Sequence, residues 1–160
     1  MMGAPVALCF LLRETAAGRE VLLGRKKRGF GQGKIVGLGG HVEPGETPAE
    51  AAVRELEEEA GVVLDLAVLV PAGTVDFRFP ARPAWDMECT MFTAAVWDGE
   101  IGESEEIEPS WYPVEDLPVE GMWQDADHWL PLVLAGTVAD FYVEMAEDNE
   151  TVFRFAVLGR

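Results

Sequence analysis

The sequence predicts an α/β domain with a mixed β-sheet, and three observations support this fold class. The chain has 160 residues, 49% of them hydrophobic and 26% charged, which is the composition of one globular domain with a sizeable core. Short apolar runs of strand length recur along most of the chain, whereas residues 47–61 change to a helical period of 3.6. Because repeats, low-complexity tracts and linkers are absent from the sequence, we expect a single domain over residues 1–160.

The first part of the chain predicts two strands and a glycine-rich loop. Residues 6–12 and 20–25 are short apolar runs separated by a turn-rich Ala-Ala-Gly at 16–18, which is typical of a hairpin or of two neighbouring strands. Residues 24–45 hold eight of the chain's 17 glycines. The backbone there is expected to adopt conformations that other residues avoid.

Residues 47–61 predict the first helix. Thr47 is suited to the N-cap, Pro48 to the first turn, and Gly61 to the end of the helix. One apolar stripe runs along the segment and is formed by Ala49, Ala52, Val53, Leu56 and Ala60. This stripe is the side that we expect to pack on the sheet.

The rest of the chain predicts further strands and a second helix. Strand-like runs cover residues 62–70, 73–79 and 88–96, and an acidic loop at 98–108 and a turn at 115–117 follow. A second helix is expected over residues 127–135, where Pro131 is tolerable only near the first turn. Residues 138–145 and 151–157 predict a closing hairpin.

Charge and cysteine usage exclude several functions. With 12 basic and 29 acidic residues the net charge is −17, which disfavours binding to a nucleic-acid polymer or to an anionic membrane surface. An anionic substrate would need a bound metal to offset this repulsion. The sequence has no apolar run of about 18 residues for a membrane span and no basic N-terminal signal. Cys9 and Cys89 lie in apolar runs, so we expect free buried thiols and a cytoplasmic protein.

Three acids share one face of the predicted helix. At about 100° per residue, Glu55, Glu58 and Glu59 fall within an arc of about 100°, whereas Glu57 points to solvent. Each like-charge pair at this spacing costs on the order of 3 kcal/mol at an effective dielectric of about 20. A hard cation such as Mg²⁺ or Mn²⁺ relieves the repulsion. The alternative is an ordinary solvated acidic face.

The residues before and within this helix decide between the two. The residue types and their spacing match the Nudix box at every defined position. The matching residues are Gly40, Glu46, Arg54-Glu55-Leu56, Glu58-Glu59 and Gly61-Val62. The sequence therefore resembles the Nudix hydrolases, which cleave a nucleoside diphosphate linked to another moiety. The resemblance implies the Nudix fold, an α/β/α sandwich with a mixed sheet and a loop–helix–loop metal site.

The resemblance also implies roles for individual residues. Mg²⁺ would be held by the Gly39 carbonyl and by four glutamates, Glu55, Glu58, Glu59 and Glu106. Glu106 is the residue of the acidic loop 103–109 that matches the family's distant acid, although a solvated loop is the alternative for any of its acids. Arg54 would orient a glutamate by a salt bridge, and Glu46 would brace the loop against the helix. Which glutamate acts as the general base is left open.

Segments outside the box resemble one branch of the family, the MutT-homologue oxidised purine nucleoside triphosphatases. These segments are residues 21–31 and 122–132, together with the acidic loop. The implied activity converts nucleotides such as 8-oxo-dGTP and 2-hydroxy-dATP to monophosphate and pyrophosphate. The four consecutive cations at 25–28 are candidates for steering phosphate, with Lys26 as the best single contact, or else ordinary solvated charges.

Further residues are expected to bind the substrate. Phe30, Phe77 and Trp123 would form the flat walls of a base slot. The other expected contacts are Val36, Leu38, Gly39, Gly40, His41 and Asp125. The branch has an asparagine where Val36 stands, a tryptophan at Ile35 and an acid at Ala126, whereas Asp125 matches.

These departures leave a rival reading open, a Nudix hydrolase acting on other nucleoside triphosphates, dinucleoside polyphosphates or nucleotide sugars. A non-catalytic binding module is disfavoured because every box acid is present. The sequence leaves open whether the protein is a monomer or a homodimer.

Overall fold

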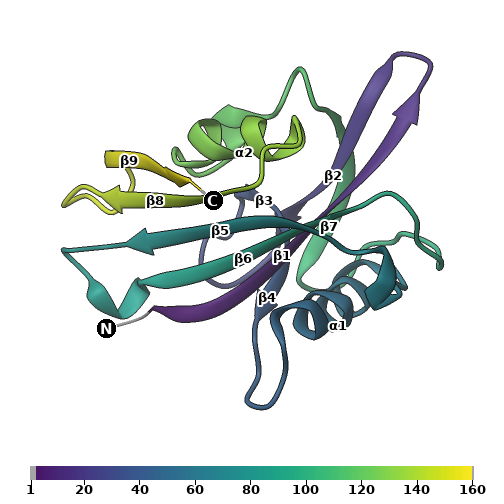
Figure 1. Cartoon of the computed structure of the whole chain (residues 1–160), viewed down its shortest axis with the longest axis horizontal. Coiled ribbons are helices and arrows are strands. Elements are labelled where there is room, and N and C mark those ends of the chain that lie inside the picture. The colour runs from purple at the N-terminus through teal and green to yellow at the C-terminus, as the bar shows by residue number, and fades with distance from the viewer. Residues whose placement is uncertain (1–2, 160) are drawn as a thin grey trace.

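One mixed β-sheet with a helix on either face organises the protein (Figure 1). The computed structural model describes residues 3–159, so the ends of the predicted domain 1–160, Met1, Met2 and Arg160, lie outside the described residues. The strands are β1 (Ala4–Thr15), β2 (Gly18–Lys26), β3 (Ile35–Val36), β4 (Leu38–His41), β5 (Val70–Arg78), β6 (Met87–Ala94), β7 (Ile107–Pro113), β8 (Ala139–Met145) and β9 (Val152–Gly159). The helices are α1 (Pro48–Ala60) and α2 (Ala126–Leu134), with short 3₁₀ turns η1 (Leu66–Val68), η2 (Pro83–Trp85) and η3 (Val119–Gly121).

The sheet combines parallel and antiparallel pairs. Its order is β3-β2-β1-β6-β5-β8-β9, with β4 paired to β1 and β7 paired to β2. The pairs β1–β6 and β5–β8 are parallel, and the other pairs are antiparallel. The predicted α/β class with a mixed sheet is confirmed.

Strand β1 separates two hydrophobic cores because its side chains alternate between the faces of the sheet. Cys9 and Leu11 are fully buried on the α1 side, whereas Phe10 is fully buried on the α2 side. Cys9 and Cys89 are free and buried, as expected. Within residues 3–159, neither helix is long and apolar enough to cross a membrane.

Helix α1 begins and ends as the sequence predicts. The Thr47 hydroxyl accepts a hydrogen bond from the Glu50 N–H at 3.1 Å, and the Glu50 carboxylate accepts one from the Thr47 N–H at 2.9 Å. This capping box satisfies two N–H groups that a helix start otherwise leaves free. Gly61 ends the helix in the left-handed region with φ 71°.

Other boundaries differ from prediction. Residues 62–70 were expected to be a strand, but they form one isolated bridge, Val63 to Asp98, and then the turn η1. Asp65 favours the turn because its carboxylate accepts a hydrogen bond from the Ala67 N–H at 2.9 Å. Strands β3, β4 and β7 were not predicted.

Helix α2 also departs from expectation, because Pro131 lies in its interior rather than in its first turn. A proline there leaves the carbonyl four residues earlier, that of Asp127, without its helical donor. Both side chains lie on the exposed face of α2. Water can therefore bond the freed carbonyl, which explains why the helix continues to Leu134.

Candidate active site

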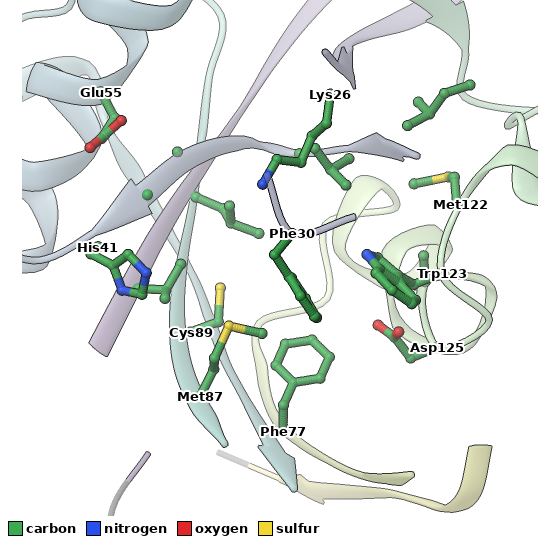
Figure 2. Close-up of a pocket in the computed structure, with 18 of the residues that line it drawn as sticks. Lys26, Phe30, His41, Glu55, Phe77, Met87, Cys89, Met122, Trp123 and Asp125 are labelled. Carbon is green, nitrogen blue, oxygen red and sulfur yellow. The ribbon is translucent and has the colours of Figure 1, made fainter. Parts of the chain in front are cut away.

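A cavity of about 430 Å³ runs from the face of α1 to the start of α2. Figure 2 shows Glu55 at one end, Phe77 and Asp125 at the other, and Phe30 between them. The cavity therefore has an acidic end and an aromatic end. The substrate residues predicted from the sequence line it with one exception: Lys26, Phe30, Val36, Gly39, Gly40, His41, Phe77, Trp123 and Asp125.

The glycines of β4 allow α1 to lie against the sheet at the acidic end. Gly39 has φ +152°, and a Cβ there would lie 1.9 Å from the carbonyl oxygen of Ala7. A Cβ on Gly40 would lie 2.6 Å from the carboxyl carbon of Glu55. Only glycine fits at position 39, because backbone occupies the space, whereas a side chain at position 40 would displace the Glu55 carboxylate.

Arg54 links the glycine-rich loop to the helix. Its Nε donates to Glu46 Oε2 at 2.8 Å and its Nη2 to Glu46 Oε1 at 3.0 Å, a bidentate pair. Nη2 also donates to the His41 carbonyl at 3.1 Å, and Nη1 donates to Glu55 Oε1 at 2.9 Å. The guanidinium lowers the pKa of Glu46 to about 2. Arg54 and Glu46 thus have the contacts that the sequence predicted for them.

Glu59 is buried at the acidic end of the cavity, and Glu55 is partly buried there. Glu59 is 9% exposed, and its Oε1 accepts a hydrogen bond from the Gly39 N–H at 2.9 Å. Burial raises its pKa to about 8, and the charges of Glu55 and Glu106 act in the same direction. Burial also raises the pKa of Glu55, against the opposing effect of Arg54.

The other two predicted acids are more open. Glu106 borders the main cavity and, together with Glu58 and Glu59, also lines an adjoining hollow. The side chains of Glu58 and Glu106 are 60% and 58% exposed. Within residues 3–159, no three His, Cys, Asp or Glu side chains converge closely enough to hold a metal as they stand. The donor set nevertheless consists of oxygens whose mutual repulsion a hard divalent cation would relieve, so these residues fit such an ion.

Lys26 differs from its neighbouring cations. Its three neighbours form ion pairs with the acidic loop. Arg25 pairs with Glu108 at 3.2 Å, Lys27 with Glu103, and Arg28 with Glu106 at 3.4 Å. Lys26 lines the cavity and has no ion pair within the part of the chain that is described. Its charge acts to lower the pKa of Glu59. Of the predicted cationic patch, Lys26 is therefore the member directed at the cavity.

The aromatic end contains one buried acid. Asp125 is 7% exposed, and its Oδ2 accepts a hydrogen bond from Trp129 Nε1 at 2.9 Å. Burial raises the pKa of Asp125. Phe30 stacks on Trp123 with ring centroids 5.4 Å apart, and Phe77 is buried at the base of the cavity. Flat apolar rings around a single acid suit a nucleobase.

Leu38 was predicted to bind substrate, and this is wrong for its side chain. Leu38 is fully buried in the core beneath α1 and is not among the described residues that form the cavity wall. The cavity is also lined by Met87, Cys89 and Met122, which were not predicted from the sequence (Figure 2). The spacing of Met87 and Cys89, two residues apart on one strand, could have placed both on the same face.

Comparison with known proteins agrees with this geometry. A sequence model of the NUDIX domain matches residues 2–133, so the chain belongs to the Nudix family. The chain is 44% identical over 115 residues to an oxidized purine nucleoside triphosphate hydrolase of Danio rerio, and 41% identical over 116 residues to the one of Mus musculus. Each match covers 72% of this chain and 72% of the relative.

Solved structures show the same fold. A MutT protein of Bacillus halodurans superimposes with a TM-score of 0.77 over 97% of both chains at 20% identity. At this identity the match concerns the fold alone. The resemblance to the Nudix family that the sequence predicted is thereby confirmed, and hydrolases of this family generally need a divalent metal cation.

Proposed function

We propose that the protein is a Mg²⁺-dependent hydrolase that converts oxidised purine nucleoside triphosphates, such as 8-oxo-dGTP and 2-hydroxy-dATP, to the monophosphate and pyrophosphate. The proposal rests on one observation: the same cavity has carboxylates at one end and an aromatic slot with a buried acid at the other. The two relatives described above bear the name of this activity, which supports the same substrate class.

The acidic end is proposed to hold the metal and the triphosphate. Mg²⁺, or Mn²⁺ in its place, would be held by the Gly39 carbonyl and by Glu55, Glu58, Glu59 and Glu106. When bound, such a cation offsets charge on phosphate oxygens and lowers the pKa of water. Arg54 keeps Glu55 in place through its Nη1 hydrogen bond, and Lys26 faces the phosphates.

The reaction itself is a hydrolysis at phosphorus. A box glutamate takes a proton from the attacking water, the water oxygen bonds to phosphorus, and the bond to the leaving phosphate oxygen breaks. The nucleoside monophosphate and pyrophosphate are the products. The main role of the protein is to hold the attacking water in line with the phosphorus and the leaving oxygen, within reach of the carboxylates.

The aromatic end is proposed to bind the base against Phe30, Phe77 and Trp123, with Asp125 as the group that reads its edge. Val36 offers only an apolar wall where the branch of the family that the sequence resembles has an asparagine. This favours a second candidate function, hydrolysis of a broader range of nucleotides with weaker preference for oxidised bases. An apolar pocket alone discriminates by only about 10- to 200-fold.

We also propose that the protein acts in the cytoplasm on free nucleotides rather than on a nucleic-acid polymer or at a membrane. Its free buried thiols suit a reducing compartment, and its net charge of −17 opposes anionic surfaces.

The test is kcat/KM with Mg²⁺ across normal, oxidised and methylated purine triphosphates, with the products identified. We expect 8-oxo-dGTP and 2-hydroxy-dATP to exceed dGTP and dATP, with pyrophosphate released. Equal kcat/KM for all of them would favour the broader hydrolase, and no turnover of any would overturn both.

A further inference from the structure

Phe30 lies between two tryptophans, and only one of them belongs to the cavity wall. Its ring stacks on Trp123 at 5.4 Å with an interplanar angle of 18°, and the edge-on ring of Trp85 lies 4.8 Å away. Trp123 lines the cavity, whereas Trp85 is outside the wall that the described residues form. Trp85 therefore touches Phe30 without facing the space where a base would bind.

Within the described residues, the backbone hydrogen bonds that close the loop around Phe30, such as the one from the Gln32 N–H to the Gly29 carbonyl at 3.1 Å, do not include Phe30 itself. Phe30 lies in the loop between β2 and β3, flanked by Gly29 and Gly31, whose φ angles are +81° and +80°. Glycine restricts the backbone least of all residues. The ring is also 45% exposed, so burial does not hold it. Its position depends on its aromatic neighbours.

Trp85, in contrast, is held firmly by the connection between β5 and β6. The Asp86 carboxylate accepts a hydrogen bond from the Phe79 N–H at 2.7 Å and closes this connection on itself. The Trp85 ring packs edge-on against Phe79 at 5.8 Å, and the guanidinium of Arg82 lies 4.3 Å from the ring centroid on one face. A fixed ring thus supports a loosely held one.

The spacing of Phe30 and Trp123 limits where a base can lie. Stacked bases are about 3.4 Å apart, so a base between two parallel rings needs about 6.8 Å between them. The centroids of Phe30 and Trp123 are 5.4 Å apart, which leaves no room for that. A base must therefore lie beside the Phe30–Trp123 pair rather than between its rings, in the cavity that Phe77 also lines.

We propose that Trp85 is a positioning residue for base recognition. It holds the ring of Phe30 against Trp123 and so sets the width of the base slot. This inference rests on the proposed function. A residue of the β5–β6 connection, outside the cavity, would thus affect the binding of the base through Phe30.

The experiment compares wild type with Trp85→Ala and Trp85→Phe. Loss of an aromatic pair should raise KM for 8-oxo-dGTP about 2- to 12-fold, with kcat changed less than about 2-fold. Hydrogen exchange of the Gln32 and Lys34 amides, which bond within the Phe30 loop, should become faster. Trp85→Phe keeps an aromatic edge and should restore both values to within about 2-fold of wild type.

Phe153→Ala is the matched control, since Phe153 is an exposed aromatic residue on β9. It should leave KM and the exchange of the loop unchanged. If Trp85→Ala does not fold, Trp85→Leu keeps apolar bulk beside Phe79 and takes its place in the same assays. Unchanged KM and exchange, or a fall in kcat at constant KM, would overturn the role of Trp85. A wild type that hydrolyses no purine triphosphate would instead overturn the proposed function, so the two failures are distinguishable.

Discussion

Asp125→Asn tests base recognition because Trp129 occupies one of the two carboxylate oxygens. Oδ2 accepts the hydrogen of Trp129 Nε1 at 2.9 Å, and we propose that the other oxygen, Oδ1, faces the base. Asparagine has the same shape but only one acceptor oxygen. If that oxygen stays with Trp129, the amide NH₂ faces the base, so a donor replaces an acceptor.

The expected magnitude follows from this exchange. A hydrogen bond to a charged group contributes about 1.5–3 kcal/mol net, and each 1.36 kcal/mol is a factor of ten. Oxidation at C8 turns N7 of guanine from an acceptor into an N–H donor, which a carboxylate can accept. We therefore expect the ratio of kcat/KM for 8-oxo-dGTP over dGTP to fall by about 10- to 160-fold, mainly through 8-oxo-dGTP.

The assay is steady-state hydrolysis of both nucleotides by wild type and variant. Asp127→Asn is the matched control, because Asp127 is an exposed acid on the same helix. Its ratio should equal that of wild type. A ratio unchanged in Asp125→Asn would mean that Asp125 does not read the base, and the broader hydrolase would then be the better account.

Three further predictions concern stability and the metal. Burial raises the folded-state pKa of Asp125. The contribution of this group to the stability of the fold is therefore fully present below the unfolded-state pKa and is lost as the pH rises through the folded-state pKa. The free energy of unfolding in urea of Asp125→Asn, taken relative to that of wild type, should therefore rise as the pH rises above the ordinary pKa of an aspartate. A difference that stays constant with pH would contradict this. Gly39→Ala should lower the free energy of unfolding by more than about 2 kcal/mol, because the new Cβ would meet the carbonyl oxygen of Ala7. Gly45→Ala should cost less, because a Cβ at Gly45 would meet no atom within 4 Å. Equal losses in thermal melts would refute the close approach at Gly39. Mg²⁺ with a non-hydrolysable analogue should raise Tm, and Glu106→Ala should lower kcat while keeping that shift; wild-type kinetics in this variant would remove Glu106 from the site.

Local chemistry explains what the sequence could predict. The limits of α1 follow from Thr47, Pro48 and Gly61, which act on their own neighbours in the chain. The acids of the box are fixed in spacing by the helix, so their common face needs no tertiary information. The family could be assigned from the box residues because their spacing along the chain needs no tertiary information either.

Features that depend on distant segments could not be predicted in this way. Strand β7 contains two prolines and is formed by pairing with β2, more than 80 residues earlier, as at Arg25 and Glu108. Leu38 was misplaced because β4 has only four residues and follows a glycine, so its alternation gives no clear direction. The contact of Trp85 with Phe30 joins two loops that are unrelated in sequence.

The most direct test of the central claim is pyrophosphate release from 8-oxo-dGTP by Glu55→Gln and Glu57→Gln in the presence of Mg²⁺. Glu55 borders the cavity, whereas Glu57 is exposed on the opposite side of the same helix. We predict that Glu55→Gln lowers kcat by about 10²- to 10³-fold with an unchanged or slightly higher Tm, since one charge leaves a repelling group. Glu57→Gln should match wild type. Near-wild-type turnover by folded Glu55→Gln would contradict the assignment of this cavity as the active site.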